Sequence, residues 1–448
     1  MLISELPIIK NILNLFNLSR LISSKDTDEL QLTLGELMDN YIENCPLSFS
    51  SPNFHRDMDE YVITIIIQSI GHLYTDQELL SSELWLIYTN VKKQYFTTDY
   101  PCRSYPNSFI RRSINTEKMT EKINIIENKP QPDQRTPAWY EFRHNLITAS
   151  SAWKAFKSQS TINQLVVEKC KPLDLTKYDG VNTSTPMHHG NKYEDVSIMF
   201  YEALYKTKVK DYGCIQHDKH TFLGASPDGI NVDPSSDRYG RMVEIKNPTT
   251  REITGIPKED YWIQMQLQME TCDLNECDFL ETSFKEYEDE ESFMNDGSFI
   301  YNENNELKGV IAYFMKNGKP LYEYMPLYIN EDEHTVWFNM IMEKHKDLTW
   351  VKNIYWRLQE YSCVLVLRNK SWFQSAVYEI EAVWKIIENE KHTGYDHRLA
   401  KKNVRPSRSN SITESLQSNS CMVDVNNLQN QIIYINTSFE LMDISGAS

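Results

Sequence analysis

The sequence predicts an α/β protein, in which helices flank a mixed sheet, with a helical N-terminal region and a helical C-terminal extension. Segments of helical spacing alternate with short β-rich segments between residues 139 and 285, as expected for helices packed on a sheet. Helical periodicity also precedes and follows this middle part. From residue 405 the chain turns to Ser, Asn and Gln without an apolar period.

These observations divide the chain into five segments. Residues 1–115 carry apolar side chains at helical spacing, and residues 116–137 are polar and contain prolines, a composition typical of a linker. Residues 138–330 hold the alternating helices and strands of the core. We expect a helical region at residues 331–404 and a disordered tail at residues 405–448.

Within the core, apolar residues recur at helical spacing in segments that we expect to be helices, at residues 139–156 (broken near Thr148), 189–207 and 258–271. Runs rich in β-branched and aromatic residues predict strands at residues 209–216, 222–225, 242–245, 278–283 and 308–315. Residues 320–327 are expected to pair with the last strand across Asn317-Gly318, a dipeptide typical of two-residue hairpin turns.

The composition argues against several classes of protein. No run approaches eighteen apolar residues, so no membrane span is expected, and no secretory signal is visible at the N-terminus. The eight cysteines are scattered without a C-x-x-C pair, which argues against zinc and iron–sulfur sites. A net charge of −17 disfavours DNA binding through bulk charge, although a local groove can still grip DNA.

Two acidic motifs, Ser226-Pro227-Asp228-Gly229 and Glu244-Ile245-Lys246, are candidates for the functional chemistry. Glu244 and Lys246 point the same way because side chains alternate along a strand. Asp228 follows the neighbouring strand, so we expect both carboxylates on one side of a hairpin. Such a pair makes a hard oxygen site suited to Mg²⁺, and the Lys246 ammonium can orient or help deprotonate an attacking water. A solvated hairpin with a surface ion pair is the alternative.

Six motifs follow one another along the chain, namely WYEFR at 139–143, ITAS at 147–150, GNKYE at 190–194, SPDG at 226–229, EIK at 244–246 and YWIQMQ at 261–266. Their order and spacing resemble the lambda-exonuclease, or YqaJ-type viral recombinase, branch of the PD-(D/E)xK nucleases. The resemblance covers roughly residues 136–285, about a third of the chain. It implies a restriction-endonuclease-like core.

The resemblance also implies a metal site. Asp228 and Glu244 would be direct Mg²⁺ ligands, and the backbone carbonyl of Ile245 would supply a third oxygen. Glu194 would complete the site, Lys246 would hold the water, and Mn²⁺ should substitute for Mg²⁺. The alternative for Glu194 is an acid that is stabilised by the dipole at a helix N-terminus.

A second group of residues is predicted to bind phosphate. Arg143 and Ser150 are seven residues apart, two helical turns, so they share one side if the helix is continuous, and an Arg fork with a hydroxyl suits a phosphate. In the resembled exonucleases the matching pair lines a pocket for the DNA 5′-phosphate. The resemblance adds Ser226 and Gln266, with Gln264 as the runner-up. A surface Arg and a helix-capping Ser are the alternative.

The function that the resemblance implies is a Mg²⁺-dependent 5′-to-3′ exonuclease. It would act on double-stranded DNA ends in viral or phage recombination or replication, in the cytoplasm or nucleus of an infected cell. A single-strand annealing protein and a second copy of the chain are the expected partners. A structure-specific endonuclease and a catalytically idle DNA-binding scaffold stay open as alternatives. The sixteen-residue step from Asp228 to Glu244, with its polar insert at 231–240, is longer than is usual in the family.

Overall fold

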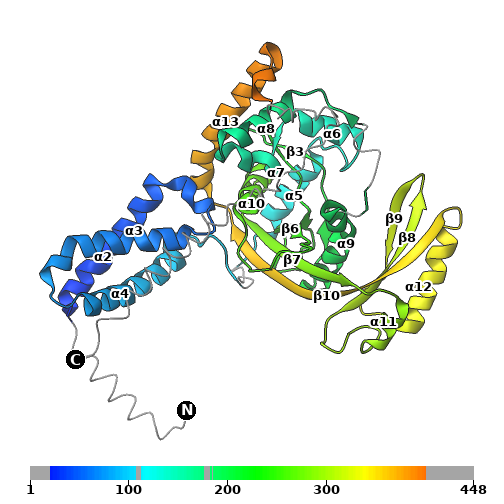
Figure 1. Cartoon of the computed structure of the whole chain (residues 1–448), viewed down its shortest axis with the longest axis horizontal. Helices are drawn as coiled ribbons and strands as arrows, with labels where there is room; N and C mark the ends of the chain where they lie inside the picture. Colours follow the sequence, from blue (N-terminus) through cyan, green and yellow to red (C-terminus); the bar gives the residue numbers. More distant parts are fainter. Residues whose placement is uncertain (1–20, 107–112, 176–181, 184, 400–448) are drawn as a thin grey trace, which may run out of the picture. The chain divides into compact units, whose positions relative to one another are not determined.

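A computed structural model describes residues 21–106, 113–175, 182–183 and 185–399 (Figure 1). All of them belong to one compact unit, and residues 400–448 lie outside the described residues. The predicted disordered tail at residues 405–448 therefore also lies outside them. No helix in the described ranges is long and apolar enough to cross a membrane.

Helices make up the described N-terminal region, as predicted. These are α2 (Ser24–Asn44), α3 (Phe54–Ile70) and α4 (Gln77–Thr98), joined by the short 3₁₀ helices η3 (Pro46–Ser50) and η4 (Gly71–Leu73). The helices α2 and α4 begin at residues whose side chains accept a hydrogen bond from the first turn, Ser23 and Asp76. Leu34 and Met38 are fully buried, so the apolar stripe read from the sequence faces the core.

Contrary to the prediction of a linker at residues 116–137, Thr116–Asn128 form helix α5. The Asn115 side chain caps this helix by accepting a hydrogen bond from the Lys118 N–H (2.9 Å). Only Ile123 and Ile126 are buried on it. Such a narrow apolar stripe among charged residues explains why the helix was missed.

A mixed sheet forms the centre of the core, as predicted (Figure 1). Its order is β2-β5-β6-β7-β10-β8-β9, in which β6 and β7 are parallel and all other neighbours are antiparallel. The strands are β2 (Val209–Lys210), β5 (Gly229–Asn231), β6 (Met242–Lys246), β7 (Glu276–Glu286), β8 (Lys308–Lys316), β9 (Lys319–Tyr324) and β10 (Thr349–Leu367). The β8–β9 hairpin turns at Asn317-Gly318, both with positive φ, as predicted.

A second, smaller sheet has the order β1-β4-β3, with strands at Ile147–Thr148, Leu223–Ala225 and Ile215–Gln216 respectively. The single strand predicted at residues 209–216 is therefore two strands in different sheets. The chain changes sheet beside Gly213, whose backbone lies so close to that of Pro132 that a Cβ would collide with it. Moreover, β4 does not pair with β6, so the hairpin partner of β6 is β5, directly after Asp228.

The helices of the core are α6 (Pro137–His144), α7 (Ala149–Ala152), η5 (Trp153–Phe156), α8 (Gln159–Cys170), α9 (Pro186–Tyr205), α10 (Glu259–Cys272) and α11 (Glu290–Asn295). The predictions at residues 189–207 and 258–271 correspond to α9 and α10. The helix predicted at 139–156 is divided at strand β1, which contains Thr148, where the break was expected.

The C-terminal region at residues 331–404 is not wholly helical. The helices α12 (Glu331–Lys344) and α13 (Lys370–Thr393) and the short η7 (Asp396–Arg398) are present, but the long strand β10 lies between the first two. Register shifts between Trp350 and Lys352 and between Leu358 and Glu360 interrupt its pairing. Because a bulge reverses the inward and outward alternation, the period-two pattern of a strand is lost from the sequence.

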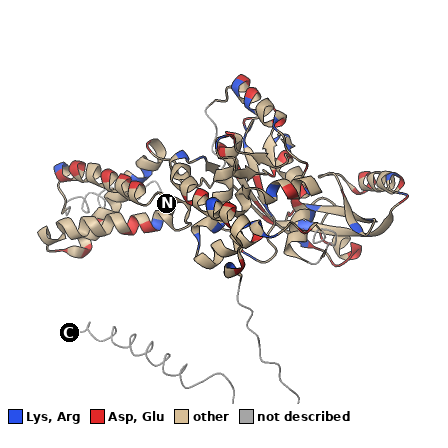
Figure 2. Ribbon diagram, turned by 90° about the horizontal axis from the view of Figure 1, so that it is seen from above, with Lys and Arg blue, Asp and Glu red and all other residues tan. Residues whose placement is uncertain are grey.

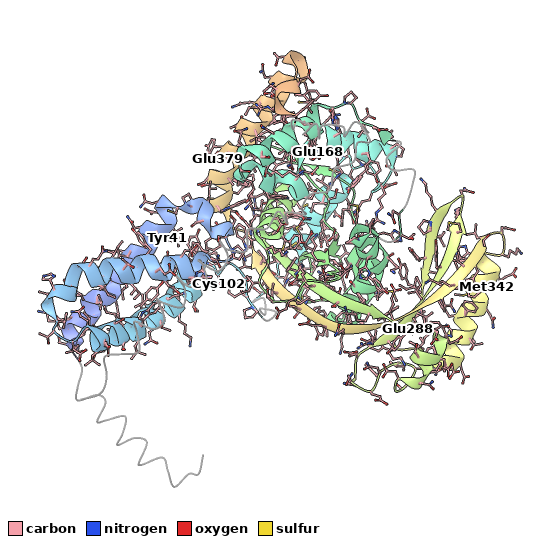
Figure 3. All side chains as sticks on the ribbon, viewed as in Figure 1. Tyr41, Cys102, Glu168, Glu288, Met342 and Glu379 are labelled. Carbon is pink, nitrogen blue, oxygen red and sulfur yellow. The ribbon has the colours of Figure 1, made fainter. Side chains whose placement is uncertain are left out.

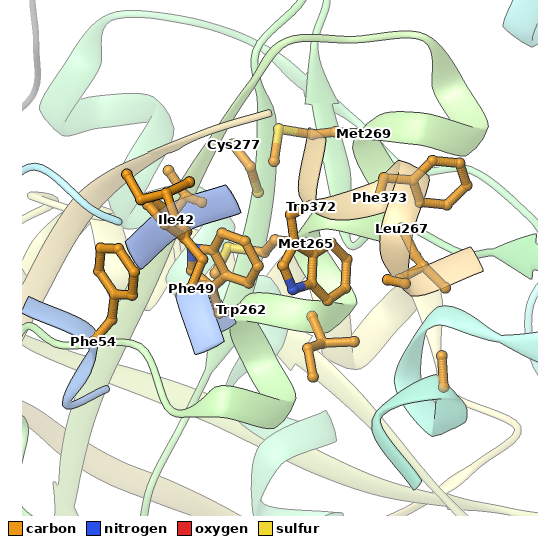
Figure 4. Close-up of a cluster of buried hydrophobic side chains, with 14 of the residues drawn as sticks. Ile42, Phe49, Phe54, Trp262, Met265, Leu267, Met269, Cys277, Trp372 and Phe373 are labelled. Carbon is orange, nitrogen blue, oxygen red and sulfur yellow. The ribbon is translucent and has the colours of Figure 1, made fainter. Parts of the chain in front are cut away.

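The Trp262 side chain joins three parts of the fold (Figure 4). It is fully buried on α10, and its ring lies 5.5 Å from that of Phe49 and 5.1 Å from that of Trp372 on α13. Its Nε1–H donates to the carbonyl of Arg103 (2.9 Å). The helix that carries the glutamines of the YWIQMQ motif is thus fixed by the N-terminal region and by α13.

We expect Trp262→Ala to lower the free energy of unfolding by about 3–5 kcal/mol, because it removes a buried aromatic ring and leaves a cavity. Trp85 is 41% exposed, so Trp85→Ala is a matched control that should change stability by only about 0.5 kcal/mol. Chemical denaturation followed by circular dichroism measures both. Equal losses in the two variants would show that Trp262 is not a structural anchor.

Candidate active site

Strand β6 presents the two ionisable residues of the Glu-x-Lys motif on one face, as predicted. The Glu244 side chain is fully buried, and the Lys246 Nζ forms an ion pair with its Oε1. Ile245, between them, belongs to an apolar cluster with Tyr201 and Leu280. The alternation of the strand therefore separates a charged face from a packed face.

Asp228 is attached to this strand by a hydrogen bond. Its Oδ2 accepts from the backbone N–H of Ile245 (2.8 Å), although the two residues belong to neighbouring segments of the sheet. Burial raises the pKa of the Asp228 carboxyl well above its usual range, and the nearby charges of Glu244 and Glu194 raise it further, while Lys246 opposes them. Asp228 and Glu244 are thus brought together, as the sequence predicts, but across the β5–β6 pair.

Glu194 reaches the same group of charges from α9. Burial raises the pKa of its carboxyl, and both Lys246 and Glu244 act on it electrostatically. Its Oε2 accepts a hydrogen bond from Arg135 (2.9 Å), a residue that the sequence analysis did not single out. Arg135 lies between α5 and α6, outside every helix and strand, so no periodic pattern pointed to it.

The donor set fits a hard divalent cation such as Mg²⁺. The negative charge of Glu244 raises the pKa of the Asp228 and Glu194 carboxyls, and a bound cation would relieve this repulsion. Among the described residues, no group of three or more His, Cys, Asp or Glu side chains is already arranged around a metal-sized position. Instead, Glu244 forms an ion pair with Lys246, and Glu194 forms one with Arg135.

A buried glutamine supports Glu244 from behind. The Gln268 Nε2 donates to Glu244 Oε2 (2.7 Å) and to the carbonyl of Ser226 (3.4 Å). The sequence analysis missed this residue, although Gln264 and Gln268 are four positions apart and so share one face of α10.

Gln266, which we predicted for the phosphate pocket, does not lie there. Its Nε2 donates to the carbonyl of Leu367 (3.0 Å), and its Oε1 accepts from the backbone N–H of Asn369 (2.7 Å). Both amide atoms therefore join α10 to the junction of β10 and α13. Gln266 lies about 200° around the helix from Gln268, which places it on the structural side.

The structure brings together three residues of the predicted pocket, Arg143, Ser150 and Ser226. The Arg143 guanidinium donates from Nη2 to Ser150 Oγ (3.1 Å) and from Nη1 to Ser226 Oγ (3.3 Å). It lies 4.2 Å from the centre of the Trp139 ring, whose Nε1–H also donates to Ser226 Oγ (3.3 Å). Arg143 and Ser150 belong to different helices, so their proximity comes from the turn at β1 and not from a shared helix face.

Beneath this cluster lies a buried lysine. The Lys169 Nζ on α8 donates to the carbonyl of Arg143 (2.9 Å) and holds the end of α6 in place. Burial, together with the nearby charge of Arg143, lowers the pKa of Lys169 to about 8.

Residues 138–275 match the YqaJ-like viral recombinase domain. The resemblance read from the six motifs is thus confirmed. The matched segment contains the three carboxylates, Lys246 and the cluster around Arg143. The YqaJ-like domain covers less than half of the chain, and the N-terminal helices and the strands β8–β10 lie outside it.

Other known proteins are similar to longer parts of the chain. An uncharacterized protein of Acanthamoeba polyphaga mimivirus, R354, is 29% identical over 330 residues, which span 64% of this chain and 57% of that protein. The solved structures of an alkaline exonuclease from Laribacter hongkongensis, alone and in complex with dAMP, cover 58% of this chain and 95% of theirs. Both have a TM-score of 0.34 and 19% identity.

The buried charge of Lys169 predicts a pH-dependent stability. Between about pH 8 and the ordinary lysine pKa of 10.5, the unfolded chain binds a proton that the folded chain has released, so this group favours folding increasingly as the pH rises. Lys169→Met removes the charge. The Arg143 carbonyl is not left without a partner, because it still accepts a hydrogen bond from the Leu146 N–H (3.3 Å). We expect the variant to melt above the wild type at neutral pH, by a difference that shrinks across this window.

Melting temperatures measured across that pH range test this expectation, with Lys171→Met, at an exposed lysine, as the control. A difference between Lys169→Met and wild type that stays constant with pH would show that Lys169 is not buried as a cation.

Proposed function

We propose that the protein is a Mg²⁺-dependent deoxyribonuclease that digests double-stranded DNA from its 5′ ends. The observation that carries this proposal is the joining of Asp228 to β6, beside Glu244 and Lys246, inside a YqaJ-like domain. The proposal extends to viral DNA recombination or replication in the cytoplasm or nucleus of an infected cell. An annealing protein and further copies of the chain are the proposed partners.

Asp228, Glu244, Glu194 and the Ile245 carbonyl would hold Mg²⁺, or Mn²⁺ in its place. When bound, the ion supplies Lewis-acid polarisation of the scissile phosphate and lowers the pKa of the attacking water. The oxygen donors come from two neighbouring strand segments and a helix, which are rigid supports for such a site.

Lys246 is proposed to orient the attacking water. Its ammonium is fixed between the Glu244 carboxylate and the ring of Tyr261, whose centre lies 5.1 Å from Nζ. Gln268 holds the other Glu244 oxygen, so the carboxylate keeps one orientation. Contacts within the fold thus position both Glu244 and Lys246.

Arg143, Ser150 and Ser226 are proposed to bind the 5′-phosphate. An Arg fork with two hydroxyls offers charge-assisted hydrogen bonds to phosphate oxygens. Ser226 is two residues before Asp228, so one segment would link recognition of the DNA end to the metal site. This link favours an end-dependent exonuclease over the endonuclease alternative, which has less need of such a pocket.

Digestion of linear and closed circular duplex in the presence of Mg²⁺ separates the candidate functions. An exonuclease degrades the linear form alone, and faster with a 5′-phosphate than with a 5′-hydroxyl. Cutting of the circle would favour the endonuclease, and intact DNA of both forms would favour the idle scaffold.

We expect Glu244→Gln and Lys246→Ala to slow cleavage by roughly a thousandfold or more, because metal-assisted activation of water supplies several kcal/mol of transition-state stabilisation. DNA binding measured without Mg²⁺ should be largely unchanged. Glu288→Gln is the charge-matched control, since Glu288 is exposed between β7 and α11 (Figure 3). Activity of the first two variants within about tenfold of wild type would contradict the assignment.

We expect Arg143→Ala to slow digestion of 5′-phosphorylated duplex by roughly ten- to a hundredfold, since a charge-assisted contact to phosphate contributes about 1.5–3 kcal/mol. Digestion of 5′-hydroxyl duplex should change far less. Arg56→Ala, at an exposed arginine of α3, controls for the lost charge. Equal slowing on both kinds of end would mean that Arg143 is structural or contacts the DNA backbone in general.

A further inference from the structure

A cleft of about 510 Å³ lies next to the candidate active site, between the first turns of α6 and α9 and the outer strand β9. This volume is in the range of known ligand sites, about 300–1,000 Å³. None of the roles assigned above uses it. Its lining combines aromatic and cationic side chains, among them Arg135, Tyr140, Lys192, Lys319, Tyr322 and Tyr324.

We propose that this cleft binds the unpaired DNA strand at the end of a duplex. The inference rests on the proposed nuclease function, which would supply the unpaired strand, whereas the binding chemistry is argued from the residues of the cleft. Proteins that bind single strands without sequence preference combine aromatic rings, on which bases stack, with cations along the backbone. The cleft offers both.

The aromatic rings of β9 are held in fixed positions. Tyr322 and Tyr324 point to the same face because they are two residues apart in the strand. The Tyr322 hydroxyl is hydrogen-bonded to His188 Nε2 (2.6 Å), and the Tyr324 hydroxyl is hydrogen-bonded to Asp195. Both partners belong to α9, so the helix braces the hairpin across the cleft. Rings fixed in this way lose little freedom when a base stacks on them.

The charges around the cleft favour a nucleic-acid backbone moderately. The lining contains three cationic side chains, Arg135, Lys192 and Lys319, and one carboxylate, Asp195. Lys192 is bonded to Glu286 (2.5 Å) and Arg135 to Glu194 (2.9 Å), so part of this positive charge is already balanced. The chain has a net charge of −17, and basic and acidic residues are interspersed along it (Figure 2). Such a site would therefore rely on stacking as well as on charge.

Two residues that line the cleft also contact residues at the candidate active site. Arg135 lines the cleft and donates to Glu194 of the proposed metal site. Tyr140 lines it from α6, and its ring lies 5.0 Å from that of Trp139, which contacts Arg143 and Ser226. A strand separated from its complement at the phosphate pocket would therefore meet the cleft directly.

Fluorescence anisotropy of a labelled oligothymidylate about 16 nucleotides long, with the full chain in EDTA, tests the proposal without cleavage. We expect the double variant Tyr322→Ala and Tyr324→Ala to weaken binding about tenfold or more, since each lost stacking contact is a large part of the affinity. The double variant Tyr322→Phe and Tyr324→Phe keeps the rings and should bind within about threefold of wild type. Lys346→Ala, at an exposed lysine of no assigned role, should bind like wild type.

A second measurement keeps the proposal open to refutation if the double alanine variant does not fold. Lys319→Ala should flatten the dependence of log affinity on log salt by about 0.7, the value for one contact to a single strand. An unchanged slope would overturn the proposal, as would a wild type that does not bind the oligonucleotide. Folded alanine variants that bind like wild type, or phenylalanine variants that lose as much as the alanine variants, would overturn it too.

Digestion of linear duplex with Mg²⁺, measured on the same preparations, separates this proposal from the proposed function. A wild type that binds the oligonucleotide through Tyr322 and Tyr324 but does not cut DNA would support the cleft and contradict the nuclease. A wild type that cuts DNA but does not bind the oligonucleotide would support the nuclease and contradict the proposed role of the cleft.

Discussion

One hydrogen bond, from the Ile245 N–H to Asp228, determines the geometry of the candidate site (2.8 Å). The β5–β6 pairing brings the backbone at Gly229 beside β6, and this hydrogen bond then fixes the Asp228 side chain to the Glu-x-Lys strand. With it, Asp228 lies on the charged face beside Glu244, and Ser226, two residues earlier, lies beside Arg143. The metal site and the phosphate pocket thus depend on the same backbone contact.

The opposite face of the sheet carries a second set of buried charges that holds this region in shape. Asp278 of β7, in register with Val243, accepts hydrogen bonds from Tyr201 (2.6 Å) and Arg241 (3.0 Å) and pairs with Arg238. Arg238 belongs to the insert at residues 231–240, which looked like a polar loop in the sequence. The insert is anchored through a fully buried carboxylate, and removing one partner of such a pair typically costs about 3–5 kcal/mol.

Local periodicity made much of the core predictable from sequence. The helices α9 and α10, the strand β6 and the β8–β9 hairpin have clear spacing or turn residues, and the shared face of Glu244 and Lys246 follows from strand geometry alone. Strand β10 was missed because its two bulges remove the period-two pattern. Helix α5 was missed because it buries too few residues to show a stripe.

The errors within the site share a different cause, which is that they concern contacts between distant residues. Gln266 and Gln268 are equally suitable in the sequence, and only the packing of α10 against β10 and α13 directs one to Leu367 and the other to Glu244. Arg135 lies in irregular backbone, so nothing local predicted its contact with Glu194. Arg143, Ser150 and Ser226 lie together as expected, although β1 places Arg143 and Ser150 in different helices.

Titration of the protein with Mn²⁺, followed by calorimetry, tests most directly whether Asp228 and Glu244 form one metal site. The informative comparison is between wild type and Asp228→Asn, because the asparagine oxygen can still accept from the Ile245 N–H while the negative charge is lost. The account predicts that wild type binds Mn²⁺ and that the variant binds at least about tenfold more weakly with an unchanged fold. Equal Mn²⁺ affinity in the two proteins would contradict it.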